Sequence, residues 1–300
     1  MKYLYYPGCS LKSTGRAYEE SLLAVFDALK IDYTEIDDWN CCGATAYMSV
    51  DETKAFTIAA RNLALAEKQF ENEEEINLIA PCAACYMVLL KTQNYLEAKP
   101  ELREKVCGAL KDAGLTNKRR VKVRHPLDVL INDISPDVIK SAVKHPLKGI
   151  KVASYYGCQT VRPYATFDDA RDPITMDQIV RILGADPVEW PLKTRCCGGS
   201  LTGTVPEVGL PLTYVLLKEA SRHGADVVVT ACPLCQFNLE CYQNKINNKF
   251  DDNINLPVIY FSQLIGLAFD IPQKKLGLQR VFIKPEKVYK TVKGGAPVYV

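Results

Sequence analysis

The sequence predicts an α/β protein made of two pseudo-symmetric, Rossmann-like repeats with mainly parallel sheets. Two observations predict this fold. Five cysteines recur in the same order roughly 150 residues further along the chain. Around them, short β-rich runs alternate with longer runs of helical periodicity, which is typical of βαβ units. Because ligands of such sheets bind beyond the carboxyl ends of the strands, we expect each set of five cysteines to form one site there.

The repeat is defined by the cysteines and by their neighbours. One copy reads C-x31-C-C-G-x38-C-x-x-C and the other reads C-x37-C-C-G-x33-C-x-x-C. Five cysteines in matching order make a chance resemblance negligible. The flanking residues match in three pairs: YYPGCS (5–10) with YYGCQT (155–160), NCCGAT (40–45) with RCCGGS (195–200), and IAPCAAC (79–85) with VTACPLC (229–235).

The elements of the first copy follow from its hydrophobic pattern. KYLYY (2–6) predicts a strand that ends at Pro-Gly-Cys, and apolar residues at helical spacing over 18–29 predict the helix after it. YTEIDDW (33–39) alternates like a strand and leads into the cysteine pair. A long amphipathic run over 56–70 predicts the next helix. INLIAPC (76–82) predicts a short buried strand that ends at the C-x-x-C motif.

The second copy has the same order of elements. IKVASYY (150–156) predicts a strand, IVRIL (179–183) a helix and PVEWPL (187–192) an extended segment before the cysteine pair. YVLLKEA (214–220) predicts a helix and ADVVVTAC (225–232) a strand before the second C-x-x-C motif. Each cysteine group therefore follows an expected strand.

The repeats predict the domain boundaries. We expect a first repeat over 1–149, a second over 150–272, and a basic C-terminal tail over 273–300 that holds seven Lys or Arg residues against one Glu. NKRRVKVR (117–124) is interpreted as part of the link between the repeats, and KHPLKG (144–149) marks their boundary.

The composition excludes several classes of protein. Hydrophobic residues make up 48% and charged residues 24% of the 300 residues, as in ordinary globular chains. A net charge of +2 indicates no nucleic-acid partner. No apolar run approaches the roughly 20 residues that span a membrane, and MKYLYYPGCS does not resemble a signal peptide. We expect a cytoplasmic protein, in which clustered cysteines bind metals or carry out redox chemistry.

Five thiols in one place favour a polynuclear metal site. Zinc takes four ligands, so five cysteines are one too many, and the adjacent Cys41 and Cys42 are better suited to binding neighbouring ions than to chelating one. Such thiolate-rich sites are typical of iron–sulfur clusters. The glycine after each cysteine pair, together with Gly8 and Gly157, indicates close approach of the backbone and positive φ. Two structural zinc sites or a thioredoxin-type dithiol stay open as alternatives, as does a zinc-stabilised assembly scaffold.

The doubled C-C-G pattern resembles the cysteine-rich CCG-domain proteins. YYPGCSLKSTGRAYEES and KTRCCGGSL are most similar to the B subunits of the soluble heterodisulfide reductases of methanogens, and the resemblance covers about residues 1–270. It implies two noncubane [4Fe-4S] clusters, each held by five cysteines. The implied ligands are Cys9, Cys41, Cys42, Cys82 and Cys85 for one cluster, and Cys158, Cys196, Cys197, Cys232 and Cys235 for the other.

The same resemblance implies an activity and partners. The substrate would be the coenzyme M–coenzyme B heterodisulfide, reduced to two thiols between the clusters. The sequence has neither a ferredoxin motif nor a G-x-G-x-x-G motif, so electrons must come from other subunits. The resemblance implies a ferredoxin-like C subunit, together with a flavoprotein as the A subunit, and a hydrogenase or a formate dehydrogenase upstream. The alternative is another CCG-domain oxidoreductase subunit that acts on a quinone or on an organic acid such as lactate.

An anionic substrate calls for cations near the cysteines. The candidates are Lys12, Arg16, Arg162, Lys193 and Arg195, which lie close in sequence to the expected ligands. The remaining cysteines, at positions 107 and 241, have no counterpart in the other repeat and are interpreted as small buried residues. The three histidines lie outside the repeated motifs and are assigned no chemistry.

Overall fold

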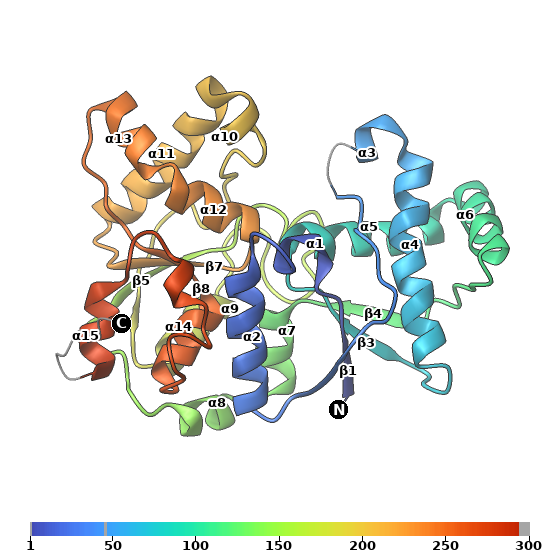
Figure 1. Cartoon of the computed structure of the whole chain (residues 1–300), viewed down its shortest axis with the longest axis horizontal. Helices are drawn as coiled ribbons and strands as arrows, with labels where there is room; N and C mark the ends of the chain where they lie inside the picture. The colour runs from blue at the N-terminus through green and yellow to red at the C-terminus, as the bar shows by residue number, and fades with distance from the viewer. Residues whose placement is uncertain (1, 45–46, 294–300) are drawn as a thin grey trace.

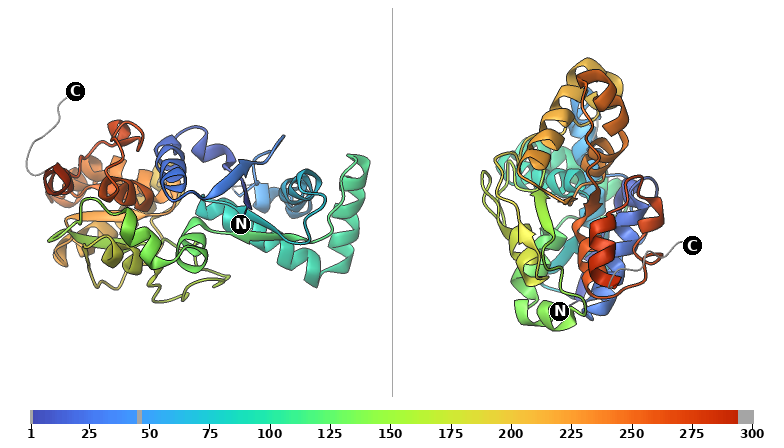
Figure 2. Two further views of the ribbon diagram at one scale, coloured as in Figure 1. Left: turned by 90° about the horizontal axis from the view of Figure 1, so that it is seen from below. Right: turned by 90° about the vertical axis from the view of Figure 1, so that its left-hand side faces the viewer.

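The computed structural model describes residues 2–44 and 47–293. Within these residues lie two four-stranded sheets in which the strands pair in parallel (Figure 1). The strand orders are β2-β1-β3-β4 and β6-β5-β7-β8, so the second sheet repeats the first. The two halves of the molecule lie side by side along its long axis (Figure 2). The predicted α/β class, with two repeats and parallel sheets, is confirmed.

The strands are short, and the first three of each sheet lie at or near the segments that the sequence predicts as extended. The first sheet contains β1 (Lys2–Tyr5), β2 (Asp32–Glu35), β3 (Ile76–Ile79) and β4 (Val121–Arg124). The second sheet contains β5 (Lys151–Tyr155), β6 (Asp186–Pro187), β7 (Val227–Thr230) and β8 (Val258–Tyr260).

Helices follow the strands in both halves. The first half contains α1 (Gly8–Leu11), α2 (Arg16–Ala28), α3 (Tyr47–Val50), α4 (Glu52–Gln69), α5 (Ala83–Ala98), α6 (Pro100–Asp112), α7 (Pro126–Asp128), a π-helical turn (Val129–Asp133) and α8 (Pro136–Ala142). The second half contains α9 (Thr175–Ile182), α10 (Leu201–Thr204), α11 (Pro206–Arg222), α12 (Pro233–Cys241), α13 (Gln243–Phe250), α14 (Phe261–Ala268), a 3₁₀ turn (Leu278–Arg280) and α15 (Glu286–Lys293).

The inner strands are apolar on both faces. All four residues of β7 are buried, and in β3 only the side chain of Asn77 is partly exposed. Continuous apolar runs of this kind are typical of parallel strands, because helices cover both faces of the sheet. The apolar core thus fixes the strand ends at which the repeated cysteines lie.

The fourth strand of each sheet was not predicted from the sequence. The interpretation of 117–124 as a link is wrong for its second half, because Val121–Arg124 form β4 and bury Val121 and Val123 against the core while Lys122 is exposed. The alternating pattern was present but was obscured by its basic residues. Strand β8 has only three residues, too few for a periodic pattern.

Helices of the two halves pack against each other in a reciprocal way. Helix α2 follows β1 but packs against α14, which follows β8 (Figure 1). At this contact Ser21 Oγ and Ser262 Oγ share a buried hydrogen bond of 2.7 Å. In the corresponding arrangement, α7 of the first half contacts α9 of the second. Each half therefore completes the packing of the other.

The basic C-terminal segment packs against the rest of the chain as far as it is described. Leu276 and Val288 are buried, and Arg280 forms an ion pair of 2.8 Å with Glu20 on α2. Residues 294–300 of the expected tail lie outside the described part. The domain boundaries at 149 and 272 stay predictions.

Candidate functional site

The five repeated cysteines of the first half gather at the carboxyl end of its sheet. Cys9 lies in α1 after β1, the Cys41–Cys42 pair follows β2, and Cys82 caps α5, which contains Cys85. The Sγ atoms of Cys9 and Cys41 are 3.8 Å apart, and those of Cys42 and Cys85 are 3.1 Å apart. Cys82 is hydrogen-bonded to Cys85, and Cys41 to Cys42. All five sulfur atoms are thus linked in one group.

The second half forms an equivalent group. Cys158 follows β5 and is hydrogen-bonded to Cys196. The Sγ atoms of Cys197 and Cys235 are 3.6 Å apart, and Cys235 is also hydrogen-bonded to Cys232. As in the first half, the second cysteine of the pair and both cysteines of the C-x-x-C motif are buried, whereas the first cysteine of the pair is exposed. Each group is therefore anchored in the core and open on one side.

Backbone N–H groups near the cysteine pairs favour the thiolate form. The N–H groups of Gly198 and Gly199 donate to Cys196 and Cys197, as those of Gly43 and Ala44 do to the pair in the first half. Hydrogen bonds to a charged group stabilise that charge. A hydrogen bond from Cys235, together with the Gly199 N–H group and the Asn238 amide, lowers the pKa of Cys197 to about 7 against the effect of burial.

A glycine packs directly against each group of cysteines, where a larger residue would place its side chain too close to sulfur. Gly8 and Gly157 have φ of +67° and +68°. A Cβ atom built on Gly8 would lie 2.9 Å from the Sγ atom of Cys85, and one built on Gly157 would lie 2.9 Å from that of Cys235. Gly43 and the equivalent glycine of the second half also have positive φ. The predicted positive φ is confirmed at all four glycines, and the predicted crowding against sulfur is confirmed at Gly8 and Gly157. It is wrong for Gly43, where an added Cβ atom would come no closer than 3.8 Å to the nearest atom, the carbonyl oxygen of Ala55.

In each half a buried tyrosine donates a hydrogen bond to the backbone just before the cysteine pair. These two tyrosines were not identified from the sequence. Tyr6 Oη donates to the carbonyl oxygen of Asn40 at 2.7 Å, and Tyr155 Oη donates to that of Arg195 at 2.7 Å. Asn40 and Arg195 are the residues directly before the two cysteine pairs. The signal was available, since both copies have a tyrosine three residues before their first cysteine.

The sulfur groups fit a polynuclear metal centre. Among the described residues, no three or more cysteine, histidine or acidic side chains are arranged to hold one metal ion. In each half, instead, the five sulfur atoms are joined through successive contacts between pairs of cysteines. No histidine or carboxylate of the described residues takes part in these contacts. Thiolates are the ligands that iron–sulfur clusters use, and several bridged ions need more sulfur ligands than one ion does. The residues present therefore fit such clusters.

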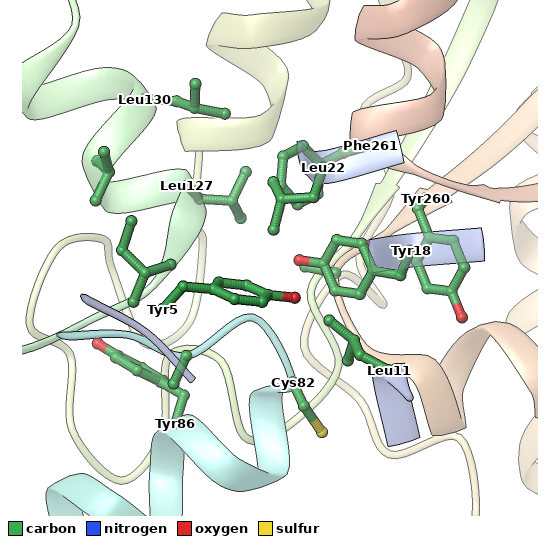
Figure 3. Packing of buried hydrophobic residues seen from close by; sticks show 14 of the residues in the cluster. Tyr5, Leu11, Tyr18, Leu22, Cys82, Tyr86, Leu127, Leu130, Tyr260 and Phe261 are labelled. Atoms are coloured by element: carbon green, nitrogen blue, oxygen red, sulfur yellow. The ribbon is translucent and has the colours of Figure 1, made fainter. Parts of the chain in front are cut away.

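One cysteine of each group, Cys82 and Cys232, lies near Tyr18 where the two halves meet. The ring of Tyr18 stacks on that of Tyr260 at a centroid distance of 4.5 Å, with Cys82 nearby (Figure 3). Burial raises the pKa of Tyr18, and sulfur atoms of both halves, those of Cys82 and Cys232, raise it further. A Cβ atom built on Gly15, in the loop before α2, would lie 3.0 Å from Pro233 of the second C-x-x-C motif.

Three of the five candidate cations are already paired with carboxylates. Lys12 Nζ lies 2.8 Å from Glu19 and 2.8 Å from Glu35. Arg16 pairs with its helix neighbour Glu20 at 3.1 Å. Lys193 is buried and pairs with Asp177 at 2.7 Å and Asp172 at 3.2 Å. These carboxylates neutralise the cations that an anionic ligand would need.

The other two cations lie beside the second cysteine pair. Arg162 donates to the carbonyl oxygen of Thr194, and Arg195 directly precedes Cys196 and is exposed. Neither arginine forms an ion pair with a carboxylate of the described residues. A hydrogen bond from Cys158, then the Gly198 N–H group and the Arg162 guanidinium, lower the pKa of Cys196 to about 6.

The cysteines without a counterpart and the histidines lie apart from the sulfur groups. Cys107 and Cys241 are half-buried, so the expectation of full burial is wrong. His125 is fully buried after β4, its ring stacks on Phe167 at 5.7 Å, and its Nδ1 accepts from the Leu127 N–H group at 3.2 Å. Burial lowers the pKa of His125 to about 3, so the side chain is neutral at physiological pH.

The repeated motif is shared with a known family. A family model described as a CCG cysteine-rich domain matches residues 3–90 and again residues 152–240. The chain belongs to this family. Both matched segments contain all five repeated cysteines of their half, which places the sulfur groups in the part that defines the family.

Relatives match over nearly the whole chain. The 8-methylmenaquinol:fumarate reductase membrane anchor subunit of Wolinella succinogenes is 31% identical, over 96% of this chain and 99% of its own. A protein of Archaeoglobus profundus described as like the B subunit of heterodisulfide reductase is 30% identical over 93% and 94%. The B subunit of the ferredoxin:CoB-CoM heterodisulfide reductase of Methanosarcina mazei is 27% identical over 91% of each chain. This member of the CCG family is thus similar to the B subunits of heterodisulfide reductases.

A solved structure shares the fold. The crystal structure of a hypothetical protein from Helicobacter pylori has a TM-score of 0.74 at 16% identity and covers 94% of this chain. This chain spans about half of that one, 52%, so the likeness concerns the fold alone. In the described part of the CCG protein, no helix has both the length and the apolar character needed to cross a membrane.

Proposed function

We propose that the chain is the catalytic subunit of an iron–sulfur oxidoreductase that reduces the coenzyme M–coenzyme B heterodisulfide to two thiols. One observation carries the proposal: the fold forms two equivalent groups of five cysteines, and one cysteine of each group, Cys82 and Cys232, lies near Tyr18 where the halves meet. Cleavage of a disulfide needs two electrons and two protons. Two metal centres that face one substrate suit this need, because an iron–sulfur cluster normally passes one electron at a time.

The ten repeated cysteines would hold two noncubane [4Fe-4S] clusters. When bound, the clusters would supply the electrons for the reaction and the iron atoms that capture the sulfur atoms of the substrate. The buried cysteines of each group fix it to the core, while exposed Cys41 and Cys196 leave it open to a ligand. The backbone N–H groups of Gly43 and Gly198 donate to the first cysteine of each pair and would stabilise the thiolate form that a cluster needs.

Arg162 and Arg195 would bind the anionic groups of the substrate. Both are close to Cys196, and neither is neutralised by a carboxylate of the described residues, unlike Lys12, Arg16 and Lys193. A guanidinium group matches the planar geometry of sulfonate, phosphate and carboxylate groups. Their position favours an anionic half of the substrate at the second site.

The electrons would come from partner subunits. The proposed partners are the ferredoxin-like C subunit, the flavoprotein A subunit, and a hydrogenase or a formate dehydrogenase upstream. The outer face of α11 supports a role within a complex, because it exposes Val208, Leu212 and Val215 at helical spacing. Apolar side chains gathered in this way mark protein interfaces.

The first test is the content of iron, zinc and acid-labile sulfide in anaerobically prepared protein. We expect about eight irons per chain with matching sulfide, since clusters of this class contain several irons each. About two zincs without sulfide would overturn the proposal, because four-coordinate zinc needs no sulfide. Reduction of the heterodisulfide by a reduced viologen dye then tests the substrate.

A second candidate function is oxidoreduction of a quinone, and an organic acid such as lactate is a further possible substrate of the same class of protein. The observation behind the quinone candidate is the similarity to the Wolinella succinogenes subunit, over 99% of that chain, whose name includes 8-methylmenaquinol. The relatives from heterodisulfide reductases support the first candidate more strongly. The dye-linked assay separates the candidates when menadione replaces the heterodisulfide. Iron-loaded protein that reduces menadione but not the heterodisulfide would favour the second candidate over the first.

A further inference from the structure

Tyr6 and Tyr155 occupy equivalent places in the two halves. Each is fully buried, each lies three residues before the first cysteine of its group, and each donates a hydrogen bond of 2.7 Å to the carbonyl oxygen before the cysteine pair. The segment that carries the first of these pairs lacks regular secondary structure from Asn40 to Gly43. The phenol therefore ties an irregular loop to the end of the central strand.

Each ring also lies against its sulfur group. The Cβ atom that Gly8 lacks would lie 3.4 Å from the Tyr6 ring and 2.9 Å from the Cys85 sulfur, so ring, glycine and sulfur are stacked together. Gly157 has the same position between Tyr155 and Cys235. Both hydroxyl groups donate to a backbone carbonyl oxygen, so each ring lies between its sulfur group and the loop that leads into the cysteine pair.

We propose that Tyr6 and Tyr155 are positioning residues for the metal centres, and that each acts on the centre of its own half. The carbonyl oxygen that accepts the phenol belongs to the residue bonded to the first cysteine of the pair. Fixing this peptide fixes the direction in which both cysteines of the pair leave the backbone. Groups that orient metal ligands in this way typically contribute about 10- to 100-fold to metal affinity or activity.

Two neighbouring tyrosines are matched controls. Tyr5 and Tyr156 are also fully buried, but Tyr5 Oη donates to Glu19 at 3.3 Å and Tyr156 Oη accepts from the Met176 N–H group at 2.5 Å. The hydroxyl groups of these two tyrosines thus form hydrogen bonds outside the loops that carry the cysteine pairs. A Tyr→Phe substitution at any of the four positions removes one buried hydroxyl from a similar environment, so a general loss of stability affects all four variants alike.

The inference rests on the part of the proposed function that places iron at the cysteines, and not on the substrate. The experiment compares wild type, Tyr6→Phe, Tyr155→Phe and the controls Tyr5→Phe and Tyr156→Phe after anaerobic reconstitution. Iron release to the chelator bathophenanthroline disulfonate is followed over time, and paramagnetic resonance spectra are recorded at half reduction. The melting temperature of each metal-free variant reports folding.

We expect Tyr6→Phe to release half of its iron about 10-fold faster than wild type and the other half at the wild-type rate. Tyr155→Phe should affect the other half of the iron, and each variant should change the spectrum of one centre alone. Release at the wild-type rate in both variants overturns the proposal, as does equal acceleration in the controls. If neither Tyr6→Phe nor Tyr155→Phe folds, their role is structural and the proposal is also overturned. Wild-type protein that binds no iron contradicts the proposed function instead.

Discussion

The two cysteine sites have the same arrangement of sulfur, glycine and tyrosine but different charges around them. In the first half Lys12 is held by Glu19 and Glu35, so its charge is neutralised within the protein. In the second half Arg162 and Arg195 have no carboxylate partner among the described residues. The features shared by both halves are those that would hold a metal centre. The features that differ are those that a ligand would meet, and this separation assigns a role to each set.

The halves also differ at the end of the fourth strand. His125 follows β4, whereas Phe261 follows β8 at the corresponding place. Both side chains are buried. The first half therefore contains a titratable group where the second half has a purely apolar one.

The largest expected effect comes from removing one ligand in either half. Cys42→Ser and Cys197→Ser should each lose about half of the bound iron, close to four of about eight ions, because each buried cysteine would belong to a separate one of the two proposed clusters. Iron and sulfide analysis measures this. Cys107→Ser, outside both groups, should keep all of the iron. Loss of all iron from either variant would mean that the halves do not hold separate centres.

Removing a cation should affect the second site much more than the first. Arg162→Gln and Arg195→Gln should raise KM for the heterodisulfide about 10- to 100-fold, because a hydrogen bond to a charged group contributes about 1.5–3 kcal/mol. Arg16→Gln, which loses an existing ion pair with Glu20, should leave KM within about 2-fold.

The neutral disulfide of 2-mercaptoethanol is the control substrate for these arginine variants. Its reduction should proceed equally well in wild type and variants, because it has no anionic group. An equal rise in KM for the neutral and the anionic substrate would show that the arginines support the site without recognising charge.

Replacing His125 by phenylalanine, the residue at the corresponding place in the other half, should make the free energy of unfolding less dependent on pH in the acidic range. The pKa of His125 is about 3 in the folded protein and 6.5 in its ordinary state, so below about pH 6.5 the unfolded chain binds one more proton. The free energy of unfolding then falls by about 1.4 kcal/mol per pH unit as the pH decreases towards 3. In His125→Phe this contribution disappears.

Denaturant unfolding of the metal-free chain between pH 7 and pH 4 measures the difference. His145→Phe is the control, since the His145 side chain is 38% exposed. Parallel stability curves for wild type and His125→Phe would contradict the assignment of a neutral buried histidine.

The smallest expected effect concerns the hydrogen bond that joins the halves. Ser21→Ala and Ser262→Ala should each lower the free energy of unfolding by about 1–2 kcal/mol, because each leaves a buried hydroxyl without its partner across the interface. The double variant should lose less free energy of unfolding than the two single variants lose together, since it contains neither of the hydroxyl groups that the single variants leave without a partner. Urea unfolding of the four proteins measures the coupling, and strict additivity would show that the two hydroxyls are independent.

The sequence predicted most of what depends on pattern. The doubled cysteine spacing located both sulfur groups, and the apolar runs located the inner strands β1, β3, β5 and β7. Strand β8 could not be found in this way, because its register is set by pairing with β7 and not by its own three residues. Arg124 obscured β4, since a buried arginine is stable only with partners such as Asp128 and Asp133, which fold next to it.

The sequence also could not predict which of the candidate cations form ion pairs with carboxylates. Lys12, Lys193 and Arg162 are all close to cysteines in sequence, but only folding decides which of them meets a carboxylate. Glu35 reaches Lys12 from β2, and Asp177 reaches Lys193 from α9. Contacts of this kind join residues that are 16 or more positions apart, so no local pattern records them.

The reciprocal packing of α2 on α14 and of α7 on α9 has a consequence for the origin of the chain. A single ancestral repeat with the same helices could have covered its apolar surface only by pairing with a second copy, as a symmetric homodimer. Joining two copies in one gene would then have allowed one arginine-bearing and one neutralised site to evolve separately. If so, a chain cut between Ala142 and Lys151 will yield two fragments that fold when expressed together and aggregate when expressed alone.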